Sequence, residues 1–181
     1  MKKYAVILVG LVIFFGFWGC AKRPDRKMLE KAQQLESQEK FAEAIKQYEK
    51  IARKFPNDTL SAEALHRVGL IYTNQLQDYE KAVGTFERVA KSYANTRFGA
   101  QAQFMIGFIY NNYAPDTAKA RKAYEAFLAK YPQHELASSV QWELKYLGKD
   151  INEIPELAKA IQGGEGKKAS SSPKTTKKRA K

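Results

Sequence analysis

Few side chains in this sequence have the types and spacing that catalysis or metal binding requires. Cys20 is the only cysteine, which excludes an intramolecular disulfide and a cysteine-based metal cluster. The two histidines, His66 and His134, lie far apart in the sequence with no ligand spacing around them. No Gly-x-Ser-x-Gly, phosphate-binding glycine loop or His-Glu-x-x-His motif occurs, and the glycines at 163–166 follow a predicted helix, as in a flexible linker. We therefore expect no enzyme activity, no metal and no cofactor.

A different set of side chains recurs every 38 residues and suits the binding of a partner. Stacked on adjacent helices, these side chains would form an aromatic strip with amide donors along one edge, suited to an extended or helical apolar peptide. The alternative is that the strip packs inside the protein, because an aromatic stripe at helical spacing is often core. Its three columns are His66, Phe104 and Trp142; Leu70, Phe108 and Tyr146; and Asn74 and Asn112.

The same 38-residue period runs through the residues that must build the fold. Ala44, Ala82 and Ala120 are each followed by an aromatic residue four positions later and an apolar residue seven positions later. Apolar residues at three- and four-residue spacing predict one buried helical face, and a second helix precedes each of these segments. Each period therefore predicts a helix hairpin. Self-similarity at this period is typical of stacked arrays, in which each unit buries its apolar face against its neighbours.

Two residue types predict how each hairpin is held. Asp78 and Asp116 stand where a short turn becomes the second helix, where an Asp side chain can accept hydrogen bonds from the first backbone N–H groups. Gly69 and Gly107 fall in the middle of the first helix, where glycine costs about 1 kcal/mol relative to alanine. Their positions opposite the repeated alanines predict a close approach of the paired helices.

This succession of a small residue, a tyrosine three positions later, an alanine and an aromatic residue four positions after it resembles the tetratricopeptide repeat, as in Gly69, Tyr72, Ala82 and Phe86. The resemblance implies an all-α superhelix of about three and a half antiparallel helix hairpins with 38-residue repeats, over residues 28–162. In such arrays the first helix of each pair lines the concave face. The resemblance therefore places the aromatic strip on that face, and it implies a non-enzymatic scaffold for protein or peptide partners.

The repeats are longer than the usual unit, and their entry segment at 56–64 is similar to that of bacterial envelope proteins. Among these, the repeats resemble those of the BamD-like lipoproteins of outer-membrane barrel assembly and of the periplasmic coordinator of the Tol-Pal system. This implies a role in outer-membrane protein assembly or in envelope maintenance. The alternative is an accessory subunit of a secretion or cell-division complex, anchored in the inner membrane.

The N-terminus predicts export and a membrane anchor. Lys2 and Lys3 precede a 16-residue apolar run that ends at Gly19, which is shorter than the roughly 20 residues that span a bilayer and fits a signal peptide over residues 1–19. The sequence around Gly19 and Cys20 resembles the lipobox of bacterial lipoproteins, which implies lipidation of Cys20 and a linker at 20–27. We expect an outer-membrane lipoprotein that faces the periplasm. The alternative is an uncleaved anchor in the inner membrane.

The positive charge is concentrated at the C-terminus. Of the net charge of +12, the segment 163–181 carries seven Lys or Arg residues and one Glu. Because this segment has almost no apolar content, we expect a disordered basic tail. In an exported protein, nucleic acid is not the expected ligand, and an anionic lipid or envelope polymer is the candidate. The alternative is a solvated tail with no dedicated ligand.

Overall fold

The computed structural model describes residues 24–149 and 153–155, and within them it contains helices and no strand. The predicted signal peptide, Cys20 and the basic tail lie outside the described residues. So does most of the predicted last helix around 151–161, of which Ile154 is described and is 5% exposed. The helices are α2 (Pro24–Ser37), α3 (Phe41–Lys54), α4 (Thr59–Asn74), α5 (Tyr79–Ser92), α6 (Arg97–Asn112), α7 (Thr117–Lys130) and α8 (Ala137–Tyr146).

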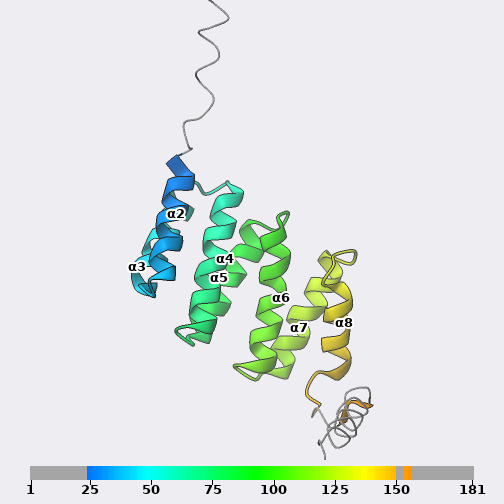
Figure 1. The fold of residues 1–181 in the computed structure, drawn as a ribbon. Helices are drawn as coiled ribbons and strands as arrows, with labels where there is room; N and C mark the ends of the chain where they lie inside the picture. Colours follow the sequence, from blue (N-terminus) through cyan, green and yellow to red (C-terminus); the bar gives the residue numbers. More distant parts are fainter. Residues whose placement is uncertain (1–23, 150–152, 156–181) are drawn as a thin grey trace, which may run out of the picture.

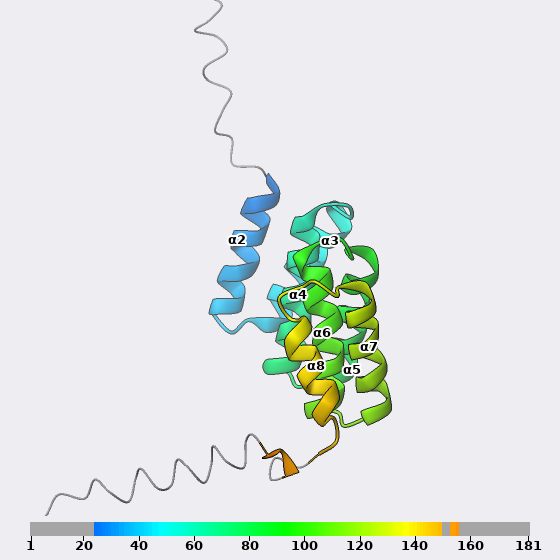
Figure 2. The ribbon, with the colours of Figure 1, turned by 90° about the vertical axis from the view of Figure 1, so that its right-hand side faces the viewer.

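The helices pair in chain order as antiparallel hairpins that stack side by side (Figure 1). The hairpins are α2 with α3, α4 with α5, and α6 with α7, and α8 packs on α7 as the first helix of a further unit. The first helices α2, α4, α6 and α8 lie on one side and the second helices α3, α5 and α7 on the other (Figure 2). We name these two surfaces the A-helix face and the B-helix face. The predicted all-α array of three and a half hairpins is confirmed.

Side chains of the predicted type begin four of the helices. The carboxylates of Asp78 and Asp116 accept hydrogen bonds from the backbone N–H groups of Lys81 and Lys119, at 3.1 and 2.9 Å. Asp58 caps α4 and Thr96 caps α6 in the same manner. Each cap satisfies a backbone donor that the first turn of a helix leaves free, so the predicted start of both second helices is confirmed.

The mid-helix glycines allow the paired helices to approach closely, as predicted. A Cβ atom on Gly69 would lie 2.6 Å from the ring of Phe86, and one on Gly107 would lie 2.5 Å from the ring of Tyr124. Both rings are fully buried. The residue that fills the space beside each glycine is thus the aromatic ring four positions after the repeated alanine.

Hydrogen bonds from tyrosines join the loops that lead from one hairpin to the next. The Tyr93 hydroxyl donates to the carbonyl of Pro56, and the Tyr131 hydroxyl donates to the carbonyl of Ala94, both at 2.8 Å. Each bond spans 37 residues. We name the segments 55–58, 93–96 and 131–136 the exit loops. These bonds tie each exit loop to the preceding exit loop. The exit loops lie at one end of the helices, and the turns within hairpins lie at the other end.

None of the described helices is long and apolar enough to cross a membrane.

Candidate protein-binding surfaces

The A-helix face carries a ladder of aromatic rings over α6. The rings of Phe104 and Phe108 stack at 5.8 Å, and Phe108 contacts the edge of Tyr113 at 5.7 Å between ring centroids. Tyr113 in turn stacks on Tyr79 at 5.3 Å with nearly parallel planes. Phe104 and Phe108 are half-buried, whereas Tyr113 is 42% exposed. We name these four residues the aromatic ladder, and Tyr113 is its most exposed member.

Two members of the ladder, Tyr79 and Tyr113, were not among the sequence-predicted residues. The prediction used side chains that recur at 38-residue steps, and the residue one repeat before Tyr113 is Gln75. Tyr113 follows the last residue of α6, and Tyr79 begins α5. The only signal in the sequence was an aromatic residue beside each turn within a hairpin.

The last helix presents one exposed ring and one enclosed ring. Trp142 is 42% exposed, and its ring centroid lies 5.0 Å from that of Tyr146, which is 7% exposed. The Asn111 amide donates to the Glu143 carboxylate at 3.0 Å and so joins α6 to α8. Burial raises the pKa of Glu143 from its ordinary value, and the hydrogen bond from Asn111 opposes that rise. A partner on this face would thus reach Trp142, while Tyr146 is held in the packing.

His66, the first member of the same column, lies within a cluster of aromatic rings. Its ring centroid is 5.4 Å from Phe86 and 5.6 Å from Phe98, and its Nε2 atom is buried without a hydrogen-bond partner. Burial, together with the charges of Arg67 and Arg97, lowers the pKa of His66 to about 4. This histidine is neutral near pH 7, and it is half-buried with its ring packed against Phe86 and Phe98. No cluster of potential metal ligands occurs in the described part of the chain.

The remaining predicted residues occupy three different environments. Leu70 is half-buried and packs against the central core. Asn74 is exposed at the end of α4. Asn112 is also exposed, but its amide donates to the Phe108 carbonyl one turn earlier at 2.9 Å. The structure therefore brings Phe104 and Phe108 together and separates them from His66, and the binding role of the set stays a prediction.

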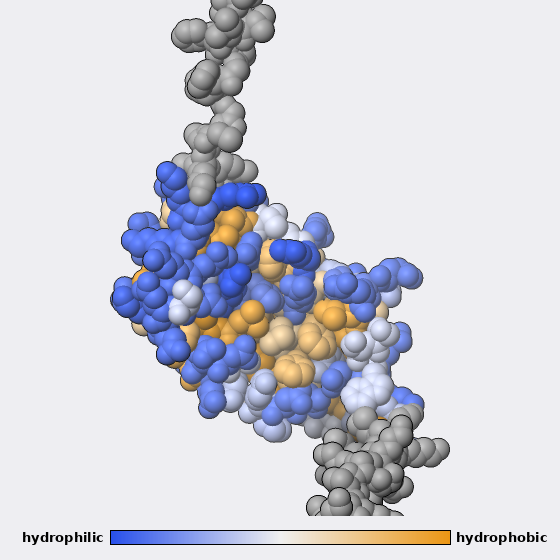
Figure 3. Space-filling view, in the orientation of Figure 1, coloured by the Kyte–Doolittle hydropathy of each residue, from blue (hydrophilic) through white to orange (hydrophobic). Residues whose placement is uncertain are grey.

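Apolar residues gather on the A-helix face as a whole. Figure 3, which views this face, shows hydrophobic residues across its middle with hydrophilic residues around them. Among described large apolar residues, Leu76, Tyr113 and Trp142 are the most exposed. Contiguous apolar surface with a polar border is typical of a site that another molecule covers.

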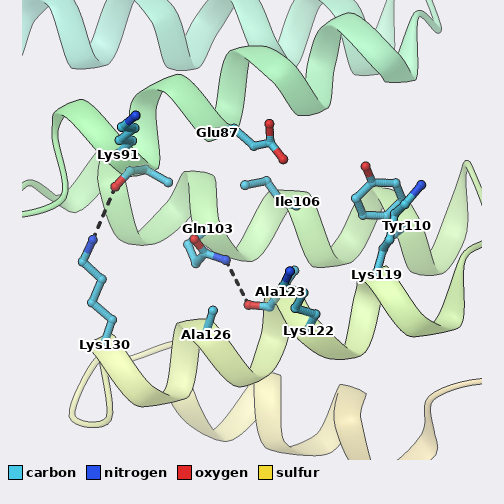
Figure 4. A pocket seen from close by; sticks show the side chains of 11 residues that line it. Glu87, Lys91, Gln103, Ile106, Tyr110, Lys119, Lys122, Ala123, Ala126 and Lys130 are labelled. Carbon is cyan, nitrogen blue, oxygen red and sulfur yellow. Dashed lines mark hydrogen bonds between the residues drawn. The ribbon is translucent and has the colours of Figure 1, made fainter.

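The B-helix face has a different kind of surface, a groove of about 670 Å³ between α5 and α7 with α6 as its floor. Figure 4 shows lysines on both of its sides, and Gln103 on the floor donates from Nε2 to the Ala123 carbonyl at 3.0 Å. The sequence analysis did not predict this groove. The residues that line it are Lys91, Lys119, Lys122 and Lys130; Glu87; Gln103, Ile106 and Tyr110; and Ala90, Ala123 and Ala126.

Stacked helix hairpins with one apolar face, one basic groove and no catalytic cluster among the described residues define an α-helical repeat array that presents surfaces for binding. The family model for the tetratricopeptide repeat matches residues 28–58, 63–96 and 101–134, which together are more than half of the chain. The chain belongs to the tetratricopeptide-repeat family, whose members are in general non-catalytic scaffolds for protein–protein interaction. No curated protein matches it.

Proposed function

We propose that this chain is a lipid-anchored scaffold of a bacterial envelope that holds an apolar segment of a partner protein on its A-helix face. The observation that carries the proposal is the aromatic ladder, together with Trp142 on the neighbouring helix. Aromatic rings that contact one another and are partly exposed supply large, rigid contact area to a peptide. The family supports protein binding in general, and the ladder supports an apolar peptide as the ligand.

The exposure of Tyr113 and Trp142 favours a binding role over simple packing for these two rings. Tyr113 and Trp142 are both 42% exposed, so truncation of either removes less buried area than truncation of an enclosed ring such as Phe86. We expect the loss of either ring to cost about 1–3 kcal/mol of folding free energy, below the roughly 3–5 kcal/mol of truncating a fully buried aromatic residue. Phe104 and Phe108, which are half-buried, serve both packing and the floor of the proposed site.

The envelope part of the proposal rests on the N-terminal sequence. A charged start, a short apolar run and Gly19-Cys20 fit a lipoprotein signal, and the resemblance to envelope proteins supports outer-membrane assembly or envelope maintenance as the process. Affinity capture from membranes, followed by mass spectrometry, tests this part. Recovery of barrel-assembly or division-site proteins would support it, whereas recovery of inner-membrane secretion components would favour the alternative.

Site-specific photo-crosslinking tests the A-helix face. A benzoylphenylalanine at Asn112, which is exposed beside the ladder, should crosslink the partner in cells. The matched control is the same group at Lys50, which is exposed on α3 of the B-helix face, outside the groove between α5 and α7. Tyr113→Ala with Trp142→Ala should abolish the crosslink at 112 without loss of folding. Equal crosslinking at both positions, or no effect of the two substitutions, would exclude the A-helix face as the site.

A further inference from the structure

The basic groove of the B-helix face has its charges arranged in a line. Lys119, Lys122, Ala126 and Lys130 follow one another on α7 at spacings of three, four and four residues, which places them along one side of the helix. Eleven residues of helix correspond to roughly 16 Å, or three turns. The lysines thus border the groove over a length that matches a short helix rather than a single small anion.

Between its charged borders, the groove is lined by small and apolar residues that come from all three helices. Ala90, Ala123 and Ala126 leave space where longer side chains would fill it, and Ile106 with Tyr110 forms the base (Figure 4). Four lysines and one glutamate give the lining a formal charge of +3. A ligand that complements this surface has an apolar side and a row of carboxylates.

The lysines differ in how far their charges are already satisfied. Lys119 pairs with Asp116 at 3.2 Å, and the Lys130 ammonium lies 3.4 Å from the Ala90 carbonyl, which bridges the end of the groove. Lys91 and Lys122 are exposed and form no ion pair with any residue that the structure describes. Two of the cations are therefore available to a partner without loss of an existing pair.

The preceding repeat lacks this arrangement at the equivalent positions. One repeat earlier, Leu65 stands in place of Gln103 and is fully buried, and Arg88 stands in place of Ala126. Gly84 and Ser92 replace Lys122 and Lys130. The space on the floor and the full lysine row are thus properties of the junction between α5 and α7, and not of every repeat.

We propose that the groove between α5 and α7 binds one acidic amphipathic helix of a partner protein. The apolar side of that helix contacts Ile106 and the three alanines, and its carboxylates face Lys119, Lys122 and Lys130. Lysines spread along three turns match carboxylates at three- and four-residue spacing, whereas one lipid phosphate would need cations that converge on one point. The basic tail of this chain carries the same sign of charge and is not the occupant. This site lies on the face opposite the aromatic ladder and does not depend on the proposed function.

The test measures fluorescence anisotropy of a defined probe with the full chain in phosphatidylcholine nanodiscs. The probe is a stapled 15-residue helix with glutamates along one flank and leucines along the other, and its control carries glutamines in place of the glutamates. Lys122→Glu with Lys130→Glu should weaken binding of the probe about tenfold, the effect of losing two charge pairs at modest strength. Lys46→Glu with Lys54→Glu on α3 makes the same charge change at the same spacing and should leave affinity within about twofold.

A third variant separates a fitted helix from general attraction to a basic protein. Ala126→Arg places in the groove the residue that the preceding repeat carries, so it fills the groove from the α7 side while it adds positive charge. A helix seated in the groove should bind this variant several-fold more weakly, whereas diffuse electrostatic attraction should bind it more tightly. Tyr113→Ala with Trp142→Ala should bind the probe as the wild type does, which separates failure of this site from failure of the A-helix face.

Several outcomes would overturn the proposal. These are the absence of saturable binding, equal affinity for the glutamine control, equal loss in the α3 variant, and undiminished binding by Ala126→Arg. Displacement of the probe by phosphatidylglycerol nanodiscs, with lipid binding lost in the Lys122→Glu and Lys130→Glu variant, would assign the groove to a lipid headgroup instead.

Discussion

The Tyr131 hydroxyl lies 2.8 Å from the carbonyl oxygen of Ala94, and this hydrogen bond joins two exit loops that are one repeat apart. Tyr93 makes the same bond to Pro56. The residue at the equivalent position of the first repeat is Phe55, which has no hydroxyl. One tyrosine hydroxyl therefore links each pair of successive exit loops.

Removal of these hydroxyls should loosen the junctions without disturbing the hairpins. Tyr93→Phe and Tyr131→Phe each leave a carbonyl without its side-chain donor, so we expect a loss of about 1 kcal/mol of unfolding free energy per substitution. Urea denaturation checks the magnitude, and Tyr110→Phe, on a half-buried ring with no hydroxyl hydrogen bond described, is the control. Equal stability of all three variants would show that the bonds contribute nothing.

The mid-helix glycines should be intolerant of a single added carbon. Gly69→Ala places a Cβ 2.6 Å from the buried Phe86 ring, and we expect overpacking to cost about 1–3 kcal/mol, more than the ~1 kcal/mol that alanine gains in helix propensity. Gly84→Ala is the matched control, because nothing lies within 4 Å of its new Cβ, and it should stabilise the protein. Thermal melts of both variants measure the difference. Stabilisation by both substitutions would contradict the close approach.

His66 should make stability fall on acidification. Its pKa is about 4 in the folded protein against 6.5 unfolded, so the unfolded chain binds more protons between these values and stability is lost as the pH falls through that range. From pH 7.5 to pH 5 the loss attributable to His66 is about 2 kcal/mol. His66→Phe, which introduces the residue found one repeat later, should remove this part of the slope. Denaturant titrations at several pH values provide the comparison.

Carboxyl groups titrate in both proteins and cancel in that comparison. The raised pKa of Glu143 acts in the opposite direction to His66, because a buried acid gains protons on folding. If the wild type and His66→Phe show the same slope between pH 7.5 and pH 5, the histidine is not buried as a neutral base.

Acylation of Cys20 is the prediction on which the membrane anchor depends. Radiolabelled palmitate should enter the wild-type chain and not Cys20→Ala, and the intact mass of the mature protein should begin at Cys20. Retention of residues 1–19 with no label would favour the uncleaved inner-membrane anchor. Ala21→Ser, beside the cysteine, controls for a general loss of export.

Features that repeat locally were predictable from the sequence. The caps at Asp78 and Asp116 depend only on the turn beside them, and the close approach at Gly69 and Gly107 depends on one hairpin. These interactions form within one unit, so a 38-residue pattern contains all the residues that make them. The number of hairpins and the helical class follow from the same pattern.

The exposure of side chains at one repeat position depends on where their repeat stands in the array. The 38-residue sequence pattern does not contain that information. His66 is enclosed by Phe98 from the next repeat, whereas Trp142, at the same register, lies on the last described hairpin helix and is 42% exposed. The groove on the B-helix face depends on three helices at once. Its origin is missing side-chain volume at Ala123 and Ala126, which becomes a surface feature only when α5, α6 and α7 are assembled.

The tyrosine ties also have a mechanical consequence. They join the exit loops at one end of the helices, so the spacing between neighbouring hairpins is pinned at that end and freer at the other. A force that bends the array would therefore rotate neighbouring hairpins about the exit loops. The opposite helix ends, where Tyr79 stacks on Tyr113, would move apart. Tension between the proposed anchor and the proposed partner would thus alter the ring contacts of the aromatic ladder before it broke any hairpin.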